Sequence, residues 1–375
     1  MTVMVVSDNI IAVCKGQFID YYDYSTHKTL ELKLSTATEE PDFICDIAIS
    51  HDKKLLAVLL TSSKRLIIYE LPLLKNVQSF VLPRSASKIR FGVNDSQIFV
   101  ADKTGDVLTY DIFKEDKGTK ILGHLSLLLN VLQTHDAKYI ITCDRDEKIR
   151  VSCYPNTYNI QTYCMGHKEF VNHIAQIPHA TGFLLSTSGD GTVKIWNYTN
   201  GKLLYTINTY TDVKNNEELK QEFSTFMDTD NVEINSLPIV DCTITQFDET
   251  SSFLSITVYS YKKILIYRLK NINEQFTHKI IGELSLENFP AAIQFHKLSL
   301  FIYDKISSAV SEYTMSYEHD FFSIDFIKTI PVFENQTIST DMNIDNNTIK
   351  VLFKRKYDNV QEYKERKKLR LEKKD

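Results

Sequence analysis

The sequence predicts an all-β protein in which seven similar units close into a ring, the architecture called a β-propeller. Three observations predict it: strand-like segments recur along the chain, their spacing is nearly constant, and glycine–histidine pairs precede two of the repeats. Hydrophobic residues make up 43% of the 375 residues and charged residues 24%. That composition supports a large packed core and excludes the intrinsically disordered class.

Five segments of the chain share one plan: an apolar strand, a polar turn, a second strand, a short turn with Asp, Gly or Lys, and a third strand. They span residues 44–69, 87–110, 128–152, 171–196 and 239–267. The ends of the first four lie 41, 42 and 44 residues apart, at Tyr69, Tyr110, Ser152 and Trp196. This is the repeat length of WD-type propeller blades.

Weaker units end at Tyr22 and Tyr313, which brings the number of predicted blades to seven. We therefore expect a WD40-type propeller over residues 1–353. In WD repeats the histidine of the Gly-His pair, a middle-strand hydroxyl and a third-strand tryptophan form a buried hydrogen-bond network. We expect such a structural network to join His124 to Thr142, and His167 to Trp196 and a serine of the sequence LLSTS.

Two segments depart from the repeat. Residues 208–236 contain seven acidic and two basic residues and no glycine. We expect this acidic insertion to be a solvated excursion between blades, with a short helix possible in its middle, rather than a binding element. Residues 354–375 contain ten basic and five acidic residues. This basic tail is expected to be helical or disordered, and to act as a nuclear import signal, an RNA-backbone contact or a plain solvated end.

Cysteine usage and hydropathy favour a soluble protein inside the cell. The six cysteines form no C-x-x-C pair, which favours buried reduced thiols over a disulfide framework or a metal site. Asp8 interrupts the first apolar stretch, so we expect a first strand rather than a signal peptide. No apolar run approaches the roughly 18 residues that span a bilayer. We expect a nuclear protein that can also be cytoplasmic.

The sequence contains no constellation that indicates an enzyme. The P-loop, G-x-S-x-G and H-E-x-x-H motifs are absent, and the glycines at 189 and 191 precede a strand rather than the helix of a nucleotide-binding turn. The repeat positions of His124 and His167 favour structural hydrogen bonds over metal ligation. We therefore expect no catalytic residue, no cofactor and no metal in this chain.

The densest cluster of charge is the sequence DRDEKIR at residues 144–150, in the turn between the second and third strands of the fourth unit. The turn is expected to share one rim of the ring with Lys103 and Lys168. Arg150 stands inside a strand, where a guanidinium requires a carboxylate. The residues alone leave two readings open: a salt bridge between blades, or docking of a partner protein.

The fourth and fifth units carry more than a generic repeat. The stretches at 121–155, 166–174 and 184–204, with their Gly-His-x-Ser-x-Leu opening and DRDEKIRVS turn and strand, resemble the WD-repeat non-catalytic subunit of tRNA guanine-N7 methyltransferase, including its Wuho-type members. Residues 101–111 of the third unit also match. Ser152 departs from the pattern, since a blade of this type ends its third strand in tryptophan.

The resemblance implies a heterodimer with a Rossmann-like catalytic subunit that binds S-adenosylmethionine and forms N7-methylguanosine in the tRNA variable loop. This chain would bind and stabilise that subunit without supplying a catalytic group. Whether it touches tRNA directly stays open. The family's docking surface maps onto Arg145, Asp146, Glu147, Lys148 and Arg150, with Lys103 and Lys168 at its flanks. The alternative function is a generic nuclear WD40 scaffold or a substrate adaptor of a ubiquitin ligase.

Overall fold

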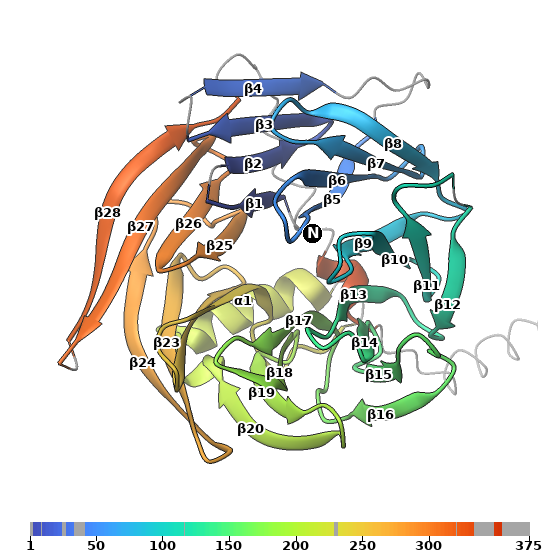
Figure 1. Cartoon of the computed structure of the whole chain (residues 1–375). Helices are drawn as coiled ribbons and strands as arrows, with labels where there is room; N and C mark the ends of the chain where they lie inside the picture. The colour runs from blue at the N-terminus through green and yellow to red at the C-terminus, as the bar shows by residue number, and fades with distance from the viewer. Residues whose placement is uncertain are drawn as a thin grey trace, which may run out of the picture.

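The computed structural model describes residues 3–8, 10–24, 28–33, 42–115, 117–228, 232–319, 321–333 and 349–354. Within these residues, 28 strands form seven four-stranded antiparallel sheets. The sheets stand around a central axis as the blades of a propeller (Figure 1). The predicted all-β, seven-bladed fold is confirmed.

Each blade uses four strands that are consecutive in the chain. Blades 1 to 4 consist of β1 (Met4–Val6), β2 (Ile10–Lys15), β3 (Phe18–Asp23) and β4 (Lys28–Lys33); β5 (Ile44–Ile49), β6 (Leu55–Leu60), β7 (Arg65–Glu70) and β8 (Lys75–Val81); β9 (Ala86–Phe91), β10 (Gln97–Asp102), β11 (Asp106–Asp111) and β12 (Thr119–Gly123); and β13 (Leu128–Gln133), β14 (Tyr139–Asp144), β15 (Ile149–Cys153) and β16 (Ile160–Cys164).

Blades 5 to 7 follow the same order. They consist of β17 (Val171–Ile177), β18 (Ala180–Ser188), β19 (Thr192–Asn197) and β20 (Lys202–Asn208); β21 (Ile239–Gln246), β22 (Ser251–Val258), β23 (Lys263–Ile272) and β24 (Gln275–Ser285); and β25 (Ala292–His296), β26 (Ser299–Asp304), β27 (Ala309–Glu318) and β28 (Phe321–Pro331). Between blades 5 and 6 lie a 3₁₀ turn, η1 (Thr209–Thr211), and helix α1 (Asn216–Asp228).

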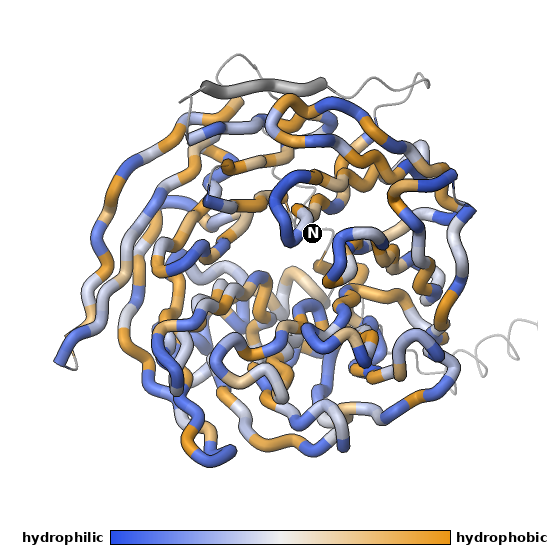
Figure 2. The backbone as a smooth tube through the Cα atoms, viewed as in Figure 1, coloured by the Kyte–Doolittle hydropathy of each residue, from blue (hydrophilic) through white to orange (hydrophobic). Residues whose placement is uncertain are grey.

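The residues that end the seven repeated units of the sequence all lie in the third strands of the blades. They are Tyr22, Tyr69, Tyr110, Ser152, Trp196, Tyr267 and Tyr313. The middle strands of the blades are almost wholly buried, as in β6 and β22, whereas an outer strand such as β8 is mostly exposed. Hydrophobic stretches therefore alternate with hydrophilic turns along the chain (Figure 2), as expected when apolar faces of neighbouring blades pack on one another.

Among the described strands, the ring closes through contacts between whole blades, and none is exchanged between them. The backbone N–H of Val6 in β1 donates to Gln294 Oε1 in β25, at 3.1 Å. The backbone N–H of Phe333, just after β28, donates to Asp20 Oδ2 in β3, at 2.6 Å. One buried cluster also joins blade 7 to blade 1 and includes Phe301 and Val13. These side-chain contacts hold the two ends of the ring together.

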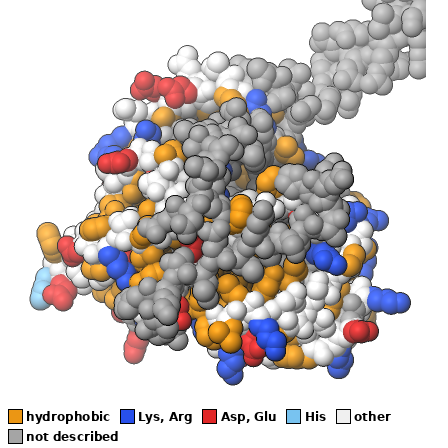
Figure 3. Space-filling model, turned by 90° about the horizontal axis from the view of Figure 1, so that it is seen from above, with side chains coloured by type: hydrophobic (Ala, Val, Ile, Leu, Met, Phe, Trp, Pro, Cys, Tyr) orange, Lys and Arg blue, Asp and Glu red, His pale blue; other side chains and the backbone are white. Residues whose placement is uncertain are grey.

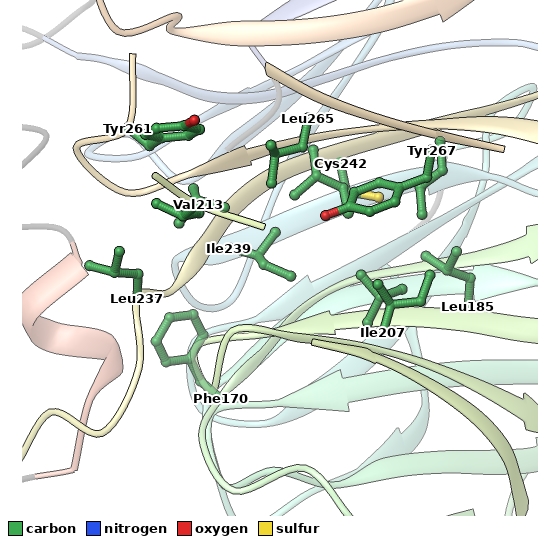
Figure 4. Close-up of a cluster of buried hydrophobic side chains, with 14 of the residues drawn as sticks. Phe170, Leu185, Ile207, Val213, Leu237, Ile239, Cys242, Tyr261, Leu265 and Tyr267 are labelled. Atoms are coloured by element: carbon green, nitrogen blue, oxygen red, sulfur yellow. The ribbon is translucent and has the colours of Figure 1, made fainter. Parts of the chain in front are cut away.

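The acidic insertion is packed against the propeller, and the expectation that it is a solvated excursion is wrong for its apolar face. Phe223 and Met227, four residues apart on α1, are fully buried because this spacing places them on one side of a helix. Val213 reaches the same cluster and lies near Ile239 (Figure 4). Hydrophobic residues spaced along an otherwise acidic segment thus fix it to blades 5 and 6.

The helices of the described residues are short. The longest is α1, with 13 residues, and none of them meets the length and hydropathy of a membrane-spanning helix.

Candidate docking surface

The turn at residues 145–148, called here the blade-4 turn, rests on a buried hydrogen-bond network. His124 lies 2.7 Å from Thr142 Oγ1 through Nε2 and 2.9 Å from Asp144 Oδ2 through Nδ1. Asp144 Oδ1 accepts backbone N–H groups of Asp146 and Lys148 at 2.9 and 3.0 Å. The side chains of His124 and Asp144 are almost inaccessible to solvent. The network therefore fixes the backbone of the turn from below.

Blade 5 repeats this arrangement with its tryptophan in place. His167 lies 2.8 Å from Ser186 Oγ and 3.0 Å from Asp190 Oδ2, and Trp196 Nε1–H donates to Ser186 Oγ at 2.8 Å. Burial lowers the pKa of His167. Burial alone would raise the pKa of Asp190, but the hydrogen bond from His167 contributes to lowering it to about 2. The carboxylate thus stays ionised and holds the imidazole in one orientation.

Glu147 adopts a backbone conformation that favours glycine. Its φ is +70°, and the corresponding turn residues of blades 3 and 5 are Gly105 (φ +104°) and Gly191 (φ +73°). A Cβ atom in this left-handed region is strained, by roughly 1 kcal/mol. The blade-4 turn thus keeps a carboxylate where its neighbours use glycine, and residues that break a local rule are often functional.

Arg150 is buried, 8% exposed, and its guanidinium donates three hydrogen bonds inside the protein. Its Nε donates to Ser152 Oγ at 2.9 Å, Nη1 to the carbonyl of Gly123 at 2.9 Å, and Nη2 to the carbonyl of Thr157 at 3.0 Å. No carboxylate among the described residues pairs with it. Gly123 ends blade 3, so the guanidinium bridges two blades through carbonyls rather than through the salt bridge that sequence reasoning considered.

The departure at Ser152 explains the position of Arg150. Ser152 pairs with Ile140 across β14 and β15, as Trp196 pairs with Leu184 in blade 5. The small serine leaves the space that an indole fills in the next blade, and the guanidinium extends toward its hydroxyl. Beside it lies an open cavity of about 470 Å³ whose lining residues are Lys120, Ile121, Leu122, Gly123, Arg150 and Tyr158.

The remaining predicted residues are accessible on the same rim. Arg145, Asp146, Glu147 and Lys148 are each partly exposed, and Lys103 and Lys168 are exposed. The backbone N–H of Arg145 donates to the carbonyl of Leu127 in the loop that enters β13, so turn and loop share one rim. Figure 3 looks onto the edge of the ring rather than onto this rim, and Lys, Arg, Asp and Glu side chains are scattered over that edge as well. On the rim itself, two cations and two anions stand side by side at residues 145–148. The surface suits a partner recognised by local charge complementarity.

One residue, Lys354, joins this rim although the sequence did not reveal it. Lys354 forms ion pairs with Glu147 and Asp146, although 207 residues separate it from Glu147. Burial, together with the nearby Glu147, raises the pKa of Glu169 to about 7. No local sequence pattern indicates a contact between residues as far apart as Lys354 and Glu147.

Among the described residues, no group of three His, Cys, Asp or Glu side chains could hold a metal ion.

The chain is similar to a family of WD-repeat subunits. Residues 115–300 match the family described as the tRNA methyltransferase TRM82 WD40 domain. The tRNA (guanine-N(7)-)-methyltransferase non-catalytic subunit wuho of Drosophila mojavensis is 30% identical over 351 residues, which cover 88% of this chain and 81% of the relative. The non-catalytic subunit wdr4 of Danio rerio is 41% identical over 171 residues, 45% of this chain and 41% of the relative.

Solved structures share the fold at low identity. A chain in the crystal structure of the mitotic checkpoint complex aligns with TM-score 0.65 and 11% identity, over 80% of this chain and 86% of that chain. The Cps50 (Swd1) β-propeller domain of Myceliophteria thermophila aligns with TM-score 0.63 and 10% identity, over 84% of this chain and 97% of that chain. At such identity these structures support the propeller architecture alone.

Proposed function

This chain belongs to the family of WD-repeat non-catalytic subunits of tRNA (guanine-N(7)-)-methyltransferase, and from that premise we propose that it binds its catalytic subunit through the blade-4 turn. The chain is a regulatory subunit and not itself an enzyme. The observation that carries the docking proposal is the turn itself: four partly exposed charges stand on a backbone that a buried His–Asp–Thr network holds rigid. Rigid placement lowers the entropic cost of association.

The proposed role of the propeller is to position the catalytic subunit. The partner is a methyltransferase that binds S-adenosylmethionine and forms N7-methylguanosine in the variable loop of tRNA. This chain holds that subunit in the conformation that accepts tRNA, so its contribution to rate comes from preorganisation. The two form a heterodimer, and tRNA is bound by the complex.

We propose a nuclear site of action, with the basic tail as the import signal. The tail, residues 354–375, contains the runs KRK and RKKLR, and such clusters of cations suit import receptors. Apart from Lys354, the tail lies outside the described residues. A fluorescent fusion of the full chain should accumulate in the nucleus, whereas a chain ending at Lys354 should spread into the cytoplasm. Equal nuclear accumulation of both would refute the import signal.

The docking proposal is tested by charge reversal on the rim. Lys148→Glu and Lys103→Glu should each weaken binding to the purified catalytic subunit by about tenfold, as measured by isothermal titration calorimetry. Each variant replaces a cation by an anion at a place where the partner is expected to present the opposite charge. Lys279→Glu, at an exposed lysine on the outer strand of blade 6, is the matched control and should bind like the wild type. If all three variants bind equally well, the subunit docks elsewhere.

A further inference from the structure

After blade 7 the chain returns to the rim of blades 4 and 5. Residues 349–354, called here the strap, contain two buried side chains, Ile349 and Phe353. The Phe353 ring meets Phe170, in the loop that enters β17, edge to face at a centroid distance of 5.1 Å. It also meets Phe223 of α1 at 5.8 Å. The strap is thus seated in the same hydrophobic cluster as the acidic insertion.

The insertion forms one side of this seat. Lys350 Nζ lies 4.0 Å from the centroid of the Phe226 ring, a cation–π contact that adds to the apolar packing. In Figure 1 the red helical turn of the strap lies beside the central axis, close to β13. In Figure 4 the red ribbon passes next to Leu237. An acidic helix and a distant segment of the chain therefore meet on one rim.

The strap ends on the blade-4 turn. Lys354 Nζ lies 2.5 Å from Glu147 Oε1 and 3.8 Å from Asp146 Oδ1. The side chain of Lys354 remains 47% exposed, and those of Glu147 and Asp146 about one-third exposed. The strap therefore neutralises the acidic half of the turn without covering it.

We propose that the insertion and the strap hold Lys354 as a fixed part of the docking surface, which is then built from two distant segments and fits an acidic patch on the catalytic subunit. With Glu147 and Asp146 paired to Lys354, the charges left to a partner are those of Arg145, Lys148 and the flanking lysines. Opposite charge on the partner then fixes the register of docking. This inference rests on the proposed function.

The packing indicates that the strap stays in place when the partner binds. Detaching it would bring the buried Ile349 and Phe353 side chains into water, which is costly. The ion pair at its end is half exposed and therefore weak by itself. The buried hydrophobic contacts thus attach the strap to the propeller, and the ion pair fixes the position of its last residue. A carboxyl group beside the pair, Glu169, has a pKa raised to about 7 by burial, consistent with a crowded, partly desolvated site.

Two shortened chains isolate the contribution of the strap. A chain ending at Lys354 keeps the strap and lacks the tail, whereas a chain ending at Thr348 lacks both. Isothermal titration calorimetry with the purified catalytic subunit, at about 150 mM salt where long-range charge effects are screened, compares their affinities. We expect the chain ending at Thr348 to bind about tenfold or more weakly than the chain ending at Lys354. Thermal unfolding of both chains shows whether the propeller itself is intact.

Point variants distinguish the lysine from its seat. Lys354→Glu should weaken binding about tenfold, Lys354→Arg should keep wild-type affinity, and Phe353→Ala should weaken binding while increasing hydrogen exchange in residues 349–354. Tighter binding without the strap would show that it blocks the surface, and unchanged binding would show that it plays no part; either result overturns the inference. If the full-length chain itself does not bind, the proposed function fails instead.

Discussion

At the scale of single residues, the most informative position is Glu147. Its positive φ costs roughly 1 kcal/mol relative to glycine, while its exposed pair with Lys354 returns about 0.5 kcal/mol. Glu147→Gly should therefore leave the free energy of unfolding within about 1 kcal/mol of wild type. It should still weaken binding of the catalytic subunit, because Lys354 loses the carboxylate that fixes its position on the docking surface. Urea denaturation and calorimetric titration measure the two quantities. A variant with unchanged affinity would show that this carboxylate serves only the fold.

The buried position of Arg150 changes what its mutation should do. Arg150→Leu leaves the carbonyls of Gly123 and Thr157 and the Ser152 hydroxyl without their donor. We expect the free energy of unfolding to fall by about 3 kcal/mol, since each unpaired buried group costs about 1–3 kcal/mol. Arg150→Lys, which keeps the charge and some donors, should lose less.

Urea denaturation measures the stability of both Arg150 variants. Because the guanidinium supports the strand beside the blade-4 turn, Arg150→Leu should also bind the catalytic subunit more weakly at a temperature where it is folded. Wild-type stability combined with lost binding would mean that Arg150 contacts the partner directly and contributes little to the blade.

Glu169 should give the fold a pH dependence near neutrality. Its pKa is about 7 in the folded chain against an ordinary value of 4.5, chiefly because of burial. Glu147 and Asp190 contribute to this rise, and Lys354 opposes it. Between these two values the folded state holds a proton that the unfolded state releases, so stability falls as pH rises through this window.

Glu169→Gln removes the titrating group, and the variant should lose this part of the pH dependence. Thermal unfolding of both chains at pH 5 and pH 8 tests it, with wild type losing more stability over the interval. Parallel changes in the two proteins would rule out Glu169 as the cause.

Residue patterns predict some of these roles and miss others for a physical reason. The Gly-His spacing indicates the partners of His124 because the repeat fixes both positions. The same repeat cannot indicate carbonyl partners for Arg150, since they depend on the space that Ser152 leaves. Lys354 and Glu147 meet only through folding of the whole chain. The docking role of the rim residues remains a prediction.

At the scale of elements, the acidic insertion behaves as part of the core. Phe223 is 1% exposed and contacts both Tyr259 and the strap residue Phe353. Phe223→Ala should lower the free energy of unfolding by about 3–5 kcal/mol, as for other buried phenylalanines. It should also increase hydrogen exchange in residues 349–354. Glu222→Ala, at an exposed position on the same helix, is the control and should have little effect on either measurement. Equal effects of the two would argue against the seat.

Strands are predicted far better than the insertion. The third strands are recognisable because a repeated unit buries the same positions in every blade. The insertion has no repeat to compare with, and its net acidity obscures the few apolar residues, Phe223 and Met227 among them, that attach it. Charge counts describe the exposed face of such a helix and give no information on its buried face.

At the scale of the whole molecule, the ring and its closure have different origins. Counting the repeated units along the chain predicts seven blades, whereas closure depends on contacts such as Val6 with Gln294 that join the two ends of the chain. The closed ring is rigid because each blade packs on both neighbours. That rigidity suits a subunit that contributes geometry to its partner rather than chemistry.

The most direct test is formation of N7-methylguanosine on tRNA by the purified catalytic subunit, with and without this chain. The account predicts a large gain in rate when the chain is added, a reduced gain with Lys148→Glu, and no product from this chain alone. Equal rates with and without the chain, together with no complex on gel filtration, would contradict it.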